Sequence, residues 1–79
     1  MLKIVAKVHG HVVSLMPDRR EVFEVDVDEP ITIRQLLRDH IGVNPMIFAA
    51  VLVDGTTQHL DYTLESDSEL LLISPVAGG

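Results

Sequence analysis

One stretch of this 79-residue chain, residues 32–42, has the pattern of an amphipathic helix, and it lies between stretches that are typical of β-strands. Thr32 is a suitable N-cap, and Gln35 three residues later predicts a capping box. Gly42 favours a stop at the other end. The stripe expected to face the sheet contains four apolar residues and one histidine: Ile33, Leu36, Leu37, His40 and Ile41. The histidine is expected to be either packed or partly exposed. Because a helix this short depends on packing, the stripe predicts a sheet beneath it.

The strand patterns differ before and after this helix. The two early strands alternate between apolar and polar side chains, which predicts an antiparallel hairpin with one buried face. The later strands include two continuous apolar runs, which favour burial on both faces, and Asp54-Gly55 predicts a turn between strands. In chain order, the expected strands cover residues 2–8, with an extension through 12–15, then 21–27, 47–53, 56–60 and 69–74.

This order of elements indicates an α+β fold, with a mixed sheet packed on one helix. The β-grasp (ubiquitin-like) fold has the same order, and in it the last strand lies in the centre of the sheet beside the first. We therefore expect a single β-grasp domain over residues 1–74 and a flexible C-terminal Gly-Gly tail over residues 75–79.

One helix covers only one face of a sheet, yet the strands at 47–53 and 69–74 are apolar on both faces. The face without the helix should then carry an apolar patch, which usually marks a contact surface for a partner. The alternative is that the loops at residues 43–46 and 54–66 fold over this face and cover the patch.

The sequence ends in Pro75-Val76-Ala77-Gly78-Gly79. Pro75 lacks an amide hydrogen, so strand pairing should stop near it, and the glycines beyond it offer no side chain to pack. These five residues reach roughly 16 Å when extended, which suits a carboxylate that enters the active site of another protein. The alternative is an ordinary loose terminus without a role.

Composition excludes several kinds of function. The formal charge of −6 argues against nucleic acid as a partner, and the absence of cysteine excludes disulfides, thiolate metal sites and a cysteine nucleophile. His9 and His11 could face the same way on a strand, but no third metal ligand is identifiable, so we expect no metal site. No phosphate-binding loop or serine nucleophile motif is present. With no signal peptide or membrane span in the pattern, we expect a cytoplasmic protein.

Three segments resemble the MoaD/ThiS-type sulfur carriers, which are ubiquitin-like proteins: Asp61-Tyr-Thr-Leu64, Asp67-Ser-Glu69-Leu70 and the tail from Pro75 to Gly79. The proline in the tail makes the chain most similar to MoaD, the small subunit of molybdopterin synthase. It departs from MoaD in having Ser74 where a second proline is common, and in residues 9–20, which match no family motif.

The resemblance implies a protein cosubstrate, the non-catalytic small subunit of a sulfurtransferase complex. An adenylyltransferase resembling ubiquitin-activating enzymes would use ATP to adenylate the Gly79 carboxylate, and sulfur would then convert it to a thiocarboxylate. The chain itself would bind no cofactor. A MoaE-like large subunit would take the sulfur for the dithiolene of molybdopterin. Contacts with these partners are expected from Leu71 and Ile73, rather than Leu70 and Leu72, and from the tail residues Pro75, Val76, Ala77 and Gly78.

Three alternatives stay open. A ThiS-like carrier would pass its sulfur to a thiazole synthase-like acceptor for thiamin, or to the thiolation of tRNA. A ubiquitin-like modifier would use the same activated Gly79 to form isopeptide bonds with lysines. A pure interaction domain would not need Gly78 and Gly79 at all.

Overall fold

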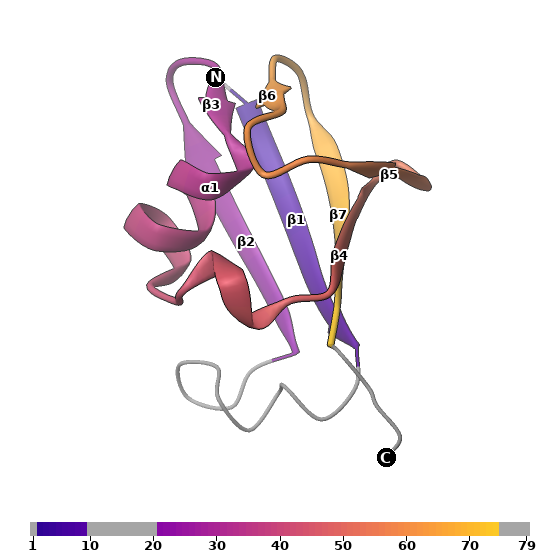
Figure 1. The fold of residues 1–79 in the computed structure, drawn as a ribbon. Coiled ribbons are helices and arrows are strands. Elements are labelled where there is room, and N and C mark those ends of the chain that lie inside the picture. Colours follow the sequence, from indigo (N-terminus) through magenta and orange to yellow (C-terminus); the bar gives the residue numbers. More distant parts are fainter. Residues whose placement is uncertain (1, 10–20, 75–79) are drawn as a thin grey trace.

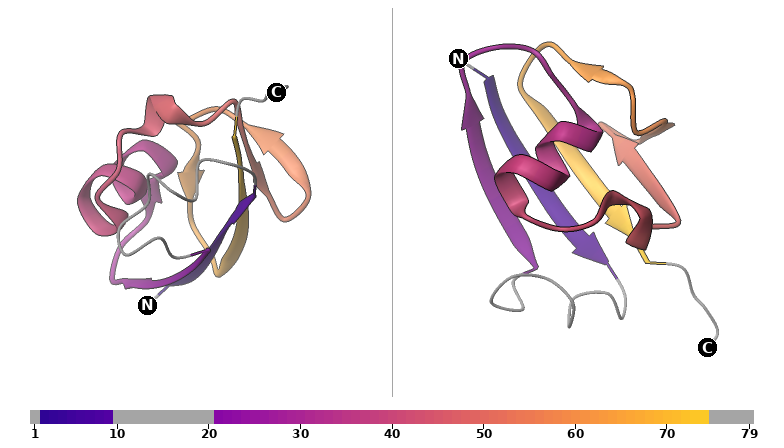
Figure 2. Two further views of the ribbon diagram at one scale, coloured as in Figure 1. Left: turned by 90° about the horizontal axis from the view of Figure 1, so that it is seen from below. Right: turned by 60° about the vertical axis from the view of Figure 1, so that its left-hand side comes forward.

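A computed structural model describes residues 2–9 and 21–74 of the chain. Its main layer is a mixed five-stranded sheet in the order β2-β1-β7-β4-β5, and one helical segment covers one face of it (Figures 1 and 2). This is the β-grasp, ubiquitin-like arrangement expected from the sequence. The strands of the sheet, in chain order, are β1 Leu2–His9, β2 Val22–Val27, β4 Ala50–Val53, β5 Thr56–Gln58 and β7 Ser68–Ile73.

The last strand lies at the centre of the sheet, as predicted. β7 pairs in parallel with β1, which places Ala6 opposite Leu70, and antiparallel with β4, which places Val51 opposite Leu72. Both neighbours of β7 therefore help to bury its inward side chains. The hairpin predicted from the alternating pattern of the first two strands is also confirmed, since β1 and β2 pair antiparallel. The predicted extension of the first strand through residues 12–15 lies outside the described residues.

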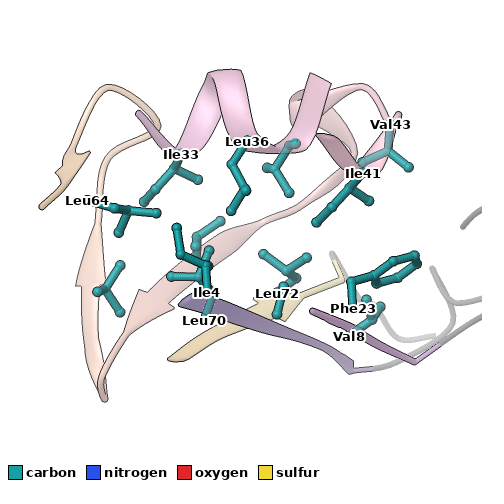
Figure 3. Close-up of a cluster of buried hydrophobic side chains, with 14 of the residues drawn as sticks. Ile4, Val8, Phe23, Ile33, Leu36, Ile41, Val43, Leu64, Leu70 and Leu72 are labelled. Atoms are coloured by element: carbon teal, nitrogen blue, oxygen red, sulfur yellow. The ribbon is translucent and has the colours of Figure 1, made fainter. Parts of the chain in front are cut away.

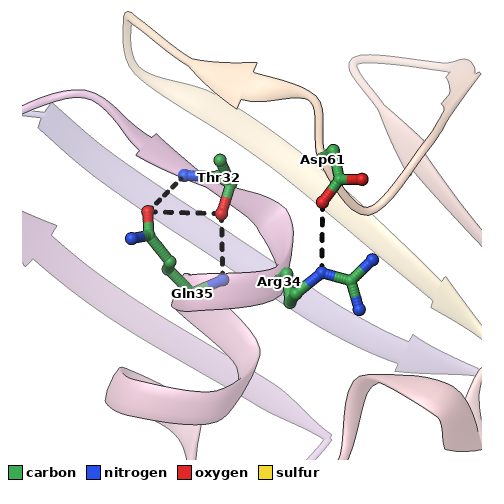
Figure 4. A network of polar contacts seen from close by, with 4 residues as sticks. All are labelled: Thr32, Arg34, Gln35 and Asp61. Atoms are coloured by element: carbon green, nitrogen blue, oxygen red, sulfur yellow. Dashed lines mark hydrogen bonds and ion pairs between the residues drawn. The ribbon is translucent and has the colours of Figure 1, made fainter.

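The helical segment begins with the capping box that the sequence predicts. The Gln35 amide donates a hydrogen bond to Thr32 Oγ1 (3.1 Å), and the Thr32 amide donates to Gln35 Oε1 (3.2 Å; Figure 4). α1 covers Ile33–Gln35 and continues as a π-helical segment over Leu36–Ile41. Gly42 ends it with a positive φ of 89°, a backbone conformation that favours glycine.

His40 was expected on the helix stripe, either packed or partly exposed, and the structure shows that this side chain is exposed. The wider winding of the π-helical segment explains its exposure. It is marked by the bond from the Gly42 amide to the Leu37 carbonyl, five residues earlier. Adding residues to the turn brings Ile41 back over the sheet, where it is 6% exposed, and turns His40 away.

The strand expected at residues 47–53 is shorter than predicted. It begins at Ala50, and Pro45–Ile47 forms a short 3₁₀ helix instead. Asn44 caps this turn by accepting the Met46 amide on Oδ1 (2.9 Å), while proline suits the first helical position. The Asn44-Pro45 pair thus favours a 3₁₀ turn where the apolar run alone predicted a strand.

The segment between β5 and β7 runs on the helix side of the sheet. The short strand expected at residues 56–60 ends at Gln58, and the final strand covers residues 68–73 rather than 69–74. Between them lies a two-stranded sheet that the sequence did not predict, made by β3 (Ile31–Thr32) and β6 (Thr63–Leu64). The predicted Asp54-Gly55 turn is confirmed, with both residues at positive φ.

The core lies between the sheet and the helical segment (Figure 3). Its fully buried side chains come from every layer, and the largest are Ile4, Ile33, Leu36, Leu37, Leu64, Leu70 and Leu72. Burying a side chain of this size contributes about 1.5–3 kcal/mol, so this cluster is the main support of the fold. No helix within the described residues is long and apolar enough to cross a membrane.

Candidate functional site

The chain leaves the sheet from its central strand. The Ser74 amide donates to the His9 carbonyl (3.1 Å) on one side of β7, and the Ala49 amide donates to the Ile73 carbonyl (2.8 Å) on the other. We call Ile73 and Ser74 the tail root. Because both neighbouring strands hold it, the tail root is fixed up to the residue before Pro75.

Side chains of β7 alternate strictly between the two faces of the sheet. Leu70 and Leu72 are 0% exposed and point into the core, whereas Leu71 and Ile73 are half-buried on the face without the helix. We call this the outer face. The sequence predicted outward positions for Leu71 and Ile73, and the structure places them so; their contact with a partner stays a prediction.

Neighbouring strands extend this apolar region. Leu71 lies opposite Leu52 of β4, and Ile73 lies opposite Ala50. The outer apolar surface consists of five half-buried residues: Val5, Ala50, Leu52, Leu71 and Ile73. Sequence reasoning placed an apolar patch around these two strands but did not single out Leu52 or Ala50, because strand register decides which residues stand beside Leu71 and Ile73.

Charged residues border the outer apolar surface. Lys7 lies opposite Leu71 on β1, and its Nζ is 3.6 Å from Glu69 Oε2. Both side chains are more than half exposed, so this ion pair contributes little to stability. A shallow hollow of about 170 Å³ opens beside it, between Leu52 and Leu71. An apolar centre with a charged rim is the usual composition of a protein contact surface.

The loops that could have covered the outer face lie elsewhere where the structure describes them. The Arg34 amide donates to the Leu60 carbonyl (2.8 Å), and the Ile33 amide donates to the Tyr62 carbonyl (3.1 Å). These bonds hold residues 60–62 against the start of the helix, and Leu64 is buried in the core. Val43 of the other loop is buried in the core as well. The alternative in which residues 43–46 and 54–66 cover the patch is therefore wrong.

A second hollow adjoins the tail root. It measures about 300 Å³ and lies between residues 45–51 and 57–60, with apolar side chains from Met46, Phe48 and Leu60 in its lining. Met46 is 73% exposed, more than any other large apolar side chain in the described part of the chain. Sequence reasoning missed this hollow because it depends on the 3₁₀ turn at Pro45–Ile47.

The reactive end of the predicted site cannot be placed. Pro75, Val76, Ala77, Gly78 and Gly79 lie outside the described residues, and so does His11, the second member of the histidine pair. Within residues 2–9 and 21–74, no three His, Asp or Glu side chains come close enough to hold a metal ion. The described part of the predicted site is thus the outer apolar surface beside the tail root.

Comparison with solved structures gives the fold. The crystal structure of SAMP1 from Haloferax volcanii superposes with a TM-score of 0.74 at 23% sequence identity, over 98% of this chain and 99% of that one. A crystal structure of H. volcanii small archaeal modifier protein 1 gives a TM-score of 0.71 at 20% identity, over 96% and 100% of the two chains. No protein-family model matches the sequence, and no curated protein matches it. At these identities the likeness establishes a shared ubiquitin-like fold.

Proposed function

We propose that this chain is a sulfur carrier that works through the carboxylate of Gly79. The observation that carries the proposal is the strand before the tail. β7 is held on both sides and turns Leu71 and Ile73 onto the outer face immediately before Pro75. A fixed root lowers the cost of ordering the tail when it enters a partner, and the apolar residues beside it supply the contact.

The chemistry requires activation, because a free carboxylate is a poor electrophile. The Gly79 carboxylate attacks the α-phosphate of ATP in a separate adenylyltransferase, which gives the acyl-adenylate and pyrophosphate. Hydrosulfide then attacks the carbonyl carbon, AMP leaves, and Gly79 carries a thiocarboxylate. Since Gly79 has no side chain, the carbonyl is open to the attacking sulfur, and Gly78 lets the partner close around the backbone.

The outer apolar surface is the proposed docking area for the adenylyltransferase and for the acceptor. Leu71 and Ile73 contact both partners in turn, and Pro75, Val76 and Ala77 guide the tail into their active sites. Using one surface for two partners lets the carrier move from the enzyme that loads it to the one that unloads it. The chain remains a cosubstrate in the cytoplasm, and the partners bind ATP and catalyse the reactions.

The Pro-Val-Ala-Gly-Gly ending favours a molybdopterin-type acceptor. In this role the chain is the small subunit that delivers sulfur to a MoaE-like large subunit for the dithiolene. A thiazole synthase-like acceptor or a tRNA-thiolating system would use the same thiocarboxylate.

Protein modification is the second candidate, and the comparison favours it specifically, because the H. volcanii protein of the same fold is named a small archaeal modifier protein. In that reaction a lysine amine of the target attacks the activated carbonyl of Gly79. An amide bond forms and the activating group leaves. The same activated intermediate serves both functions, so the two differ only in the nucleophile.

A reconstituted activation assay tests the proposal. The full chain is incubated with the adenylyltransferase of its host, ATP and sulfide, and pyrophosphate release and the intact mass are followed. We expect pyrophosphate release and replacement of one oxygen by sulfur at Gly79. Deleting Gly78 and Gly79 should abolish both signals while the circular dichroism spectrum stays unchanged. Equal activation of the shortened chain would refute the proposal.

A matched pair of variants tests the docking surface. Leu71→Ala removes an apolar side chain from the outer apolar surface and should lower the activation rate at limiting chain concentration by about tenfold. Tyr62→Ala is the control, since Tyr62 is 40% exposed and lies against the helix start. Equal loss in both variants would contradict a specific role for the outer face.

A further inference from the structure

The sheet has one long open edge, formed by β2. The strand order ends at β2, which has β1 on one side and no strand of the described chain on the other (Figure 1). β2 has six residues, whereas β5 at the opposite edge has three. An open edge of this length is a template for pairing with another extended segment.

The direction of the backbone groups on β2 follows from its pairing with β1. The Val8 amide donates to the Glu21 carbonyl (2.8 Å), and these two residues continue the register by one step beyond the pair Lys7 and Val22. Opposite pairs in an antiparallel ladder alternate between hydrogen-bonded and non-hydrogen-bonded. Val22, Glu24 and Asp26 therefore point their amide and carbonyl groups away from β1, toward the open side.

An acidic hollow of about 510 Å³ adjoins the end of this edge. It lies between the last residues of β2, the connection to β3 and the helical segment. The described residues that line it include four acidic ones and no lysine or arginine: Asp26, Asp28, Glu29 and Asp39. All four are exposed, and the ion pairs found among the described residues, Lys7–Glu69 and Arg34–Asp61, involve none of them.

We propose that β2 is a docking edge for an extended, basic segment of a partner protein. The segment adds to the sheet as a further strand and pairs with the outward backbone groups of Val22, Glu24 and Asp26. Neighbouring residues across a ladder share a face, so basic side chains lie beside Glu24 and Asp26 on the outer face. Aliphatic side chains lie beside Phe23 and Val25 on the helix side. A further basic residue reaches the acidic hollow.

Charge selects this occupant over a second copy of the chain. Antiparallel pairing of two β2 strands about Glu24 would bring acidic residues of both copies together, and like charges in opposite positions destabilise a ladder. The two chains would also each carry a net charge of −6. A cationic segment reverses this repulsion into attraction.

The docking edge is separate from the tail root. β1 stands between β2 and β7 in the sheet, so a partner at β2 leaves the outer apolar residues of β7 uncovered. The inference does not depend on the chemistry of Gly79. It adds a second recognition surface, through which the chain can hold one protein while its tail engages another.

The test uses the ¹⁵N-labelled full chain and a short peptide of alternating lysine and valine, blocked at both ends. We expect the NMR chemical shifts of the Val22, Glu24 and Asp26 amides to change saturably with peptide concentration, and their exchange with solvent to slow. The amide signals of β5 should not change. The same peptide with methyl groups on its lysine backbone nitrogens keeps its charge, but it cannot donate from the edge that would pair antiparallel with Val22, Glu24 and Asp26. It should bind at least about fivefold more weakly, the effect of losing one net hydrogen bond. Equal binding of both peptides would overturn the proposal.

Two variants of the chain test the edge and the charge separately. Val22→Pro removes an outward amide hydrogen without changing the charge, leaves the groups that face β1, and should also weaken binding about fivefold. Asp39→Asn removes a carboxylate from the acidic hollow and should weaken binding about twofold to threefold. Asp61→Asn is the charge-matched control outside the hollow and should have no effect. Equal weakening by Asp39→Asn and Asp61→Asn would overturn the assignment of the hollow.

Self-association gives the remaining outcome. If the β2 amide signals shift with protein concentration alone and sedimentation shows a dimer, the edge belongs to a second copy and the proposal is wrong. We expect unchanged β2 signals and a monomer at all concentrations used for the titration.

Discussion

Leu71 and Leu72 are adjacent leucines that we expect to have opposite roles, one in binding and one in stability. Leu72 is 0% exposed between β1 and β4, opposite Val8 and Val51, whereas Leu71 is half-buried on the outer face. Substituting each with alanine removes the same atoms from neighbouring positions of one strand. The pair therefore separates the core from the docking surface without changing the chemistry of the substitution.

The stability cost of each variant follows from burial. Leu72→Ala leaves a cavity in a packed core and should lower the free energy of unfolding by about 3 kcal/mol. Leu71→Ala removes a side chain that is already partly in water, so its cost should be about 1 kcal/mol or less. For a domain of this size the total free energy of unfolding is of the order of 4–12 kcal/mol, so the first change is a large share of it.

Urea denaturation followed by far-UV circular dichroism measures both values, and the chain has no tryptophan for a fluorescence signal. With a slope of about 1 kcal/mol per molar urea, the midpoint should fall by about 3 M for Leu72→Ala and by about 1 M or less for Leu71→Ala. If Leu72→Ala is too unstable to study, Leu72→Met gives a smaller loss in the same direction.

Binding to the adenylyltransferase should show the reverse order. Leu71→Ala should weaken it about tenfold, whereas a folded Leu72 variant should bind as the parent chain does. Equal losses of stability in the two alanine variants would refute the assignment of faces. Normal binding by Leu71→Ala would refute the docking role of the outer apolar surface.

Three further predictions concern the local structure around the helix. Thr32→Ala removes the oxygen that accepts the hydrogen bond of the Gln35 amide. It should lower the free energy of unfolding by about 1 kcal/mol and the melting temperature by about 4–8 °C. An unchanged melting temperature would show that the capping box does not stabilise the fold. Gly42→Ala should lower the free energy of unfolding, measured by urea denaturation, by about 1 kcal/mol. The cause is the positive φ alone, because an added Cβ would meet no atom within 4 Å. An unchanged free energy of unfolding would contradict this reasoning. Arg34 and Asp61 form an exposed ion pair (3.1 Å). A double-mutant cycle should therefore give a coupling free energy below about 1 kcal/mol. A larger value would mean that the pair is important for stability.

Local chemistry in the sequence predicted the features that depend on neighbouring residues. The capping box of Thr32 and Gln35, the stop at Gly42 and the turn at Asp54-Gly55 all appear where their residue types place them. The order of strands followed from the alternating and continuous apolar patterns, and the central place of the last strand was expected from the β-grasp fold, which has this order.

Features that depend on longer-range packing were predicted less well. His40 fits a regular helical stripe, but the π-helical winding over Leu36–Ile41 turns it outward. Residues 47–49 look like part of a strand, yet the capped turn at Asn44 and Pro45 prevents their pairing. The β3–β6 pair is only two residues long in each strand, which is too short for a pattern to appear.

The candidate site was predictable only in part. The alternation of β7 assigns Leu71 and Ile73 to one face, and the choice of face required knowing which side the helix covers. The neighbours of these residues, the acidic hollow and the open edge of β2 come from register and topology. Register and topology depend on residues far apart in the chain, so the pattern of a single sequence does not reveal them.

The central claim is that Gly79 carries sulfur, and the mass of the chain purified from its own cells tests it most directly. The intact protein is measured under conditions that preserve thiocarboxylates, and the C-terminal peptide is then sequenced. We predict a fraction in which one sulfur replaces one oxygen at Gly79. A free carboxylate that also stays unmodified with ATP, sulfide and the activating enzymes of the host would contradict the account, and Gly79 found only in amide linkage to lysines would replace it with protein modification.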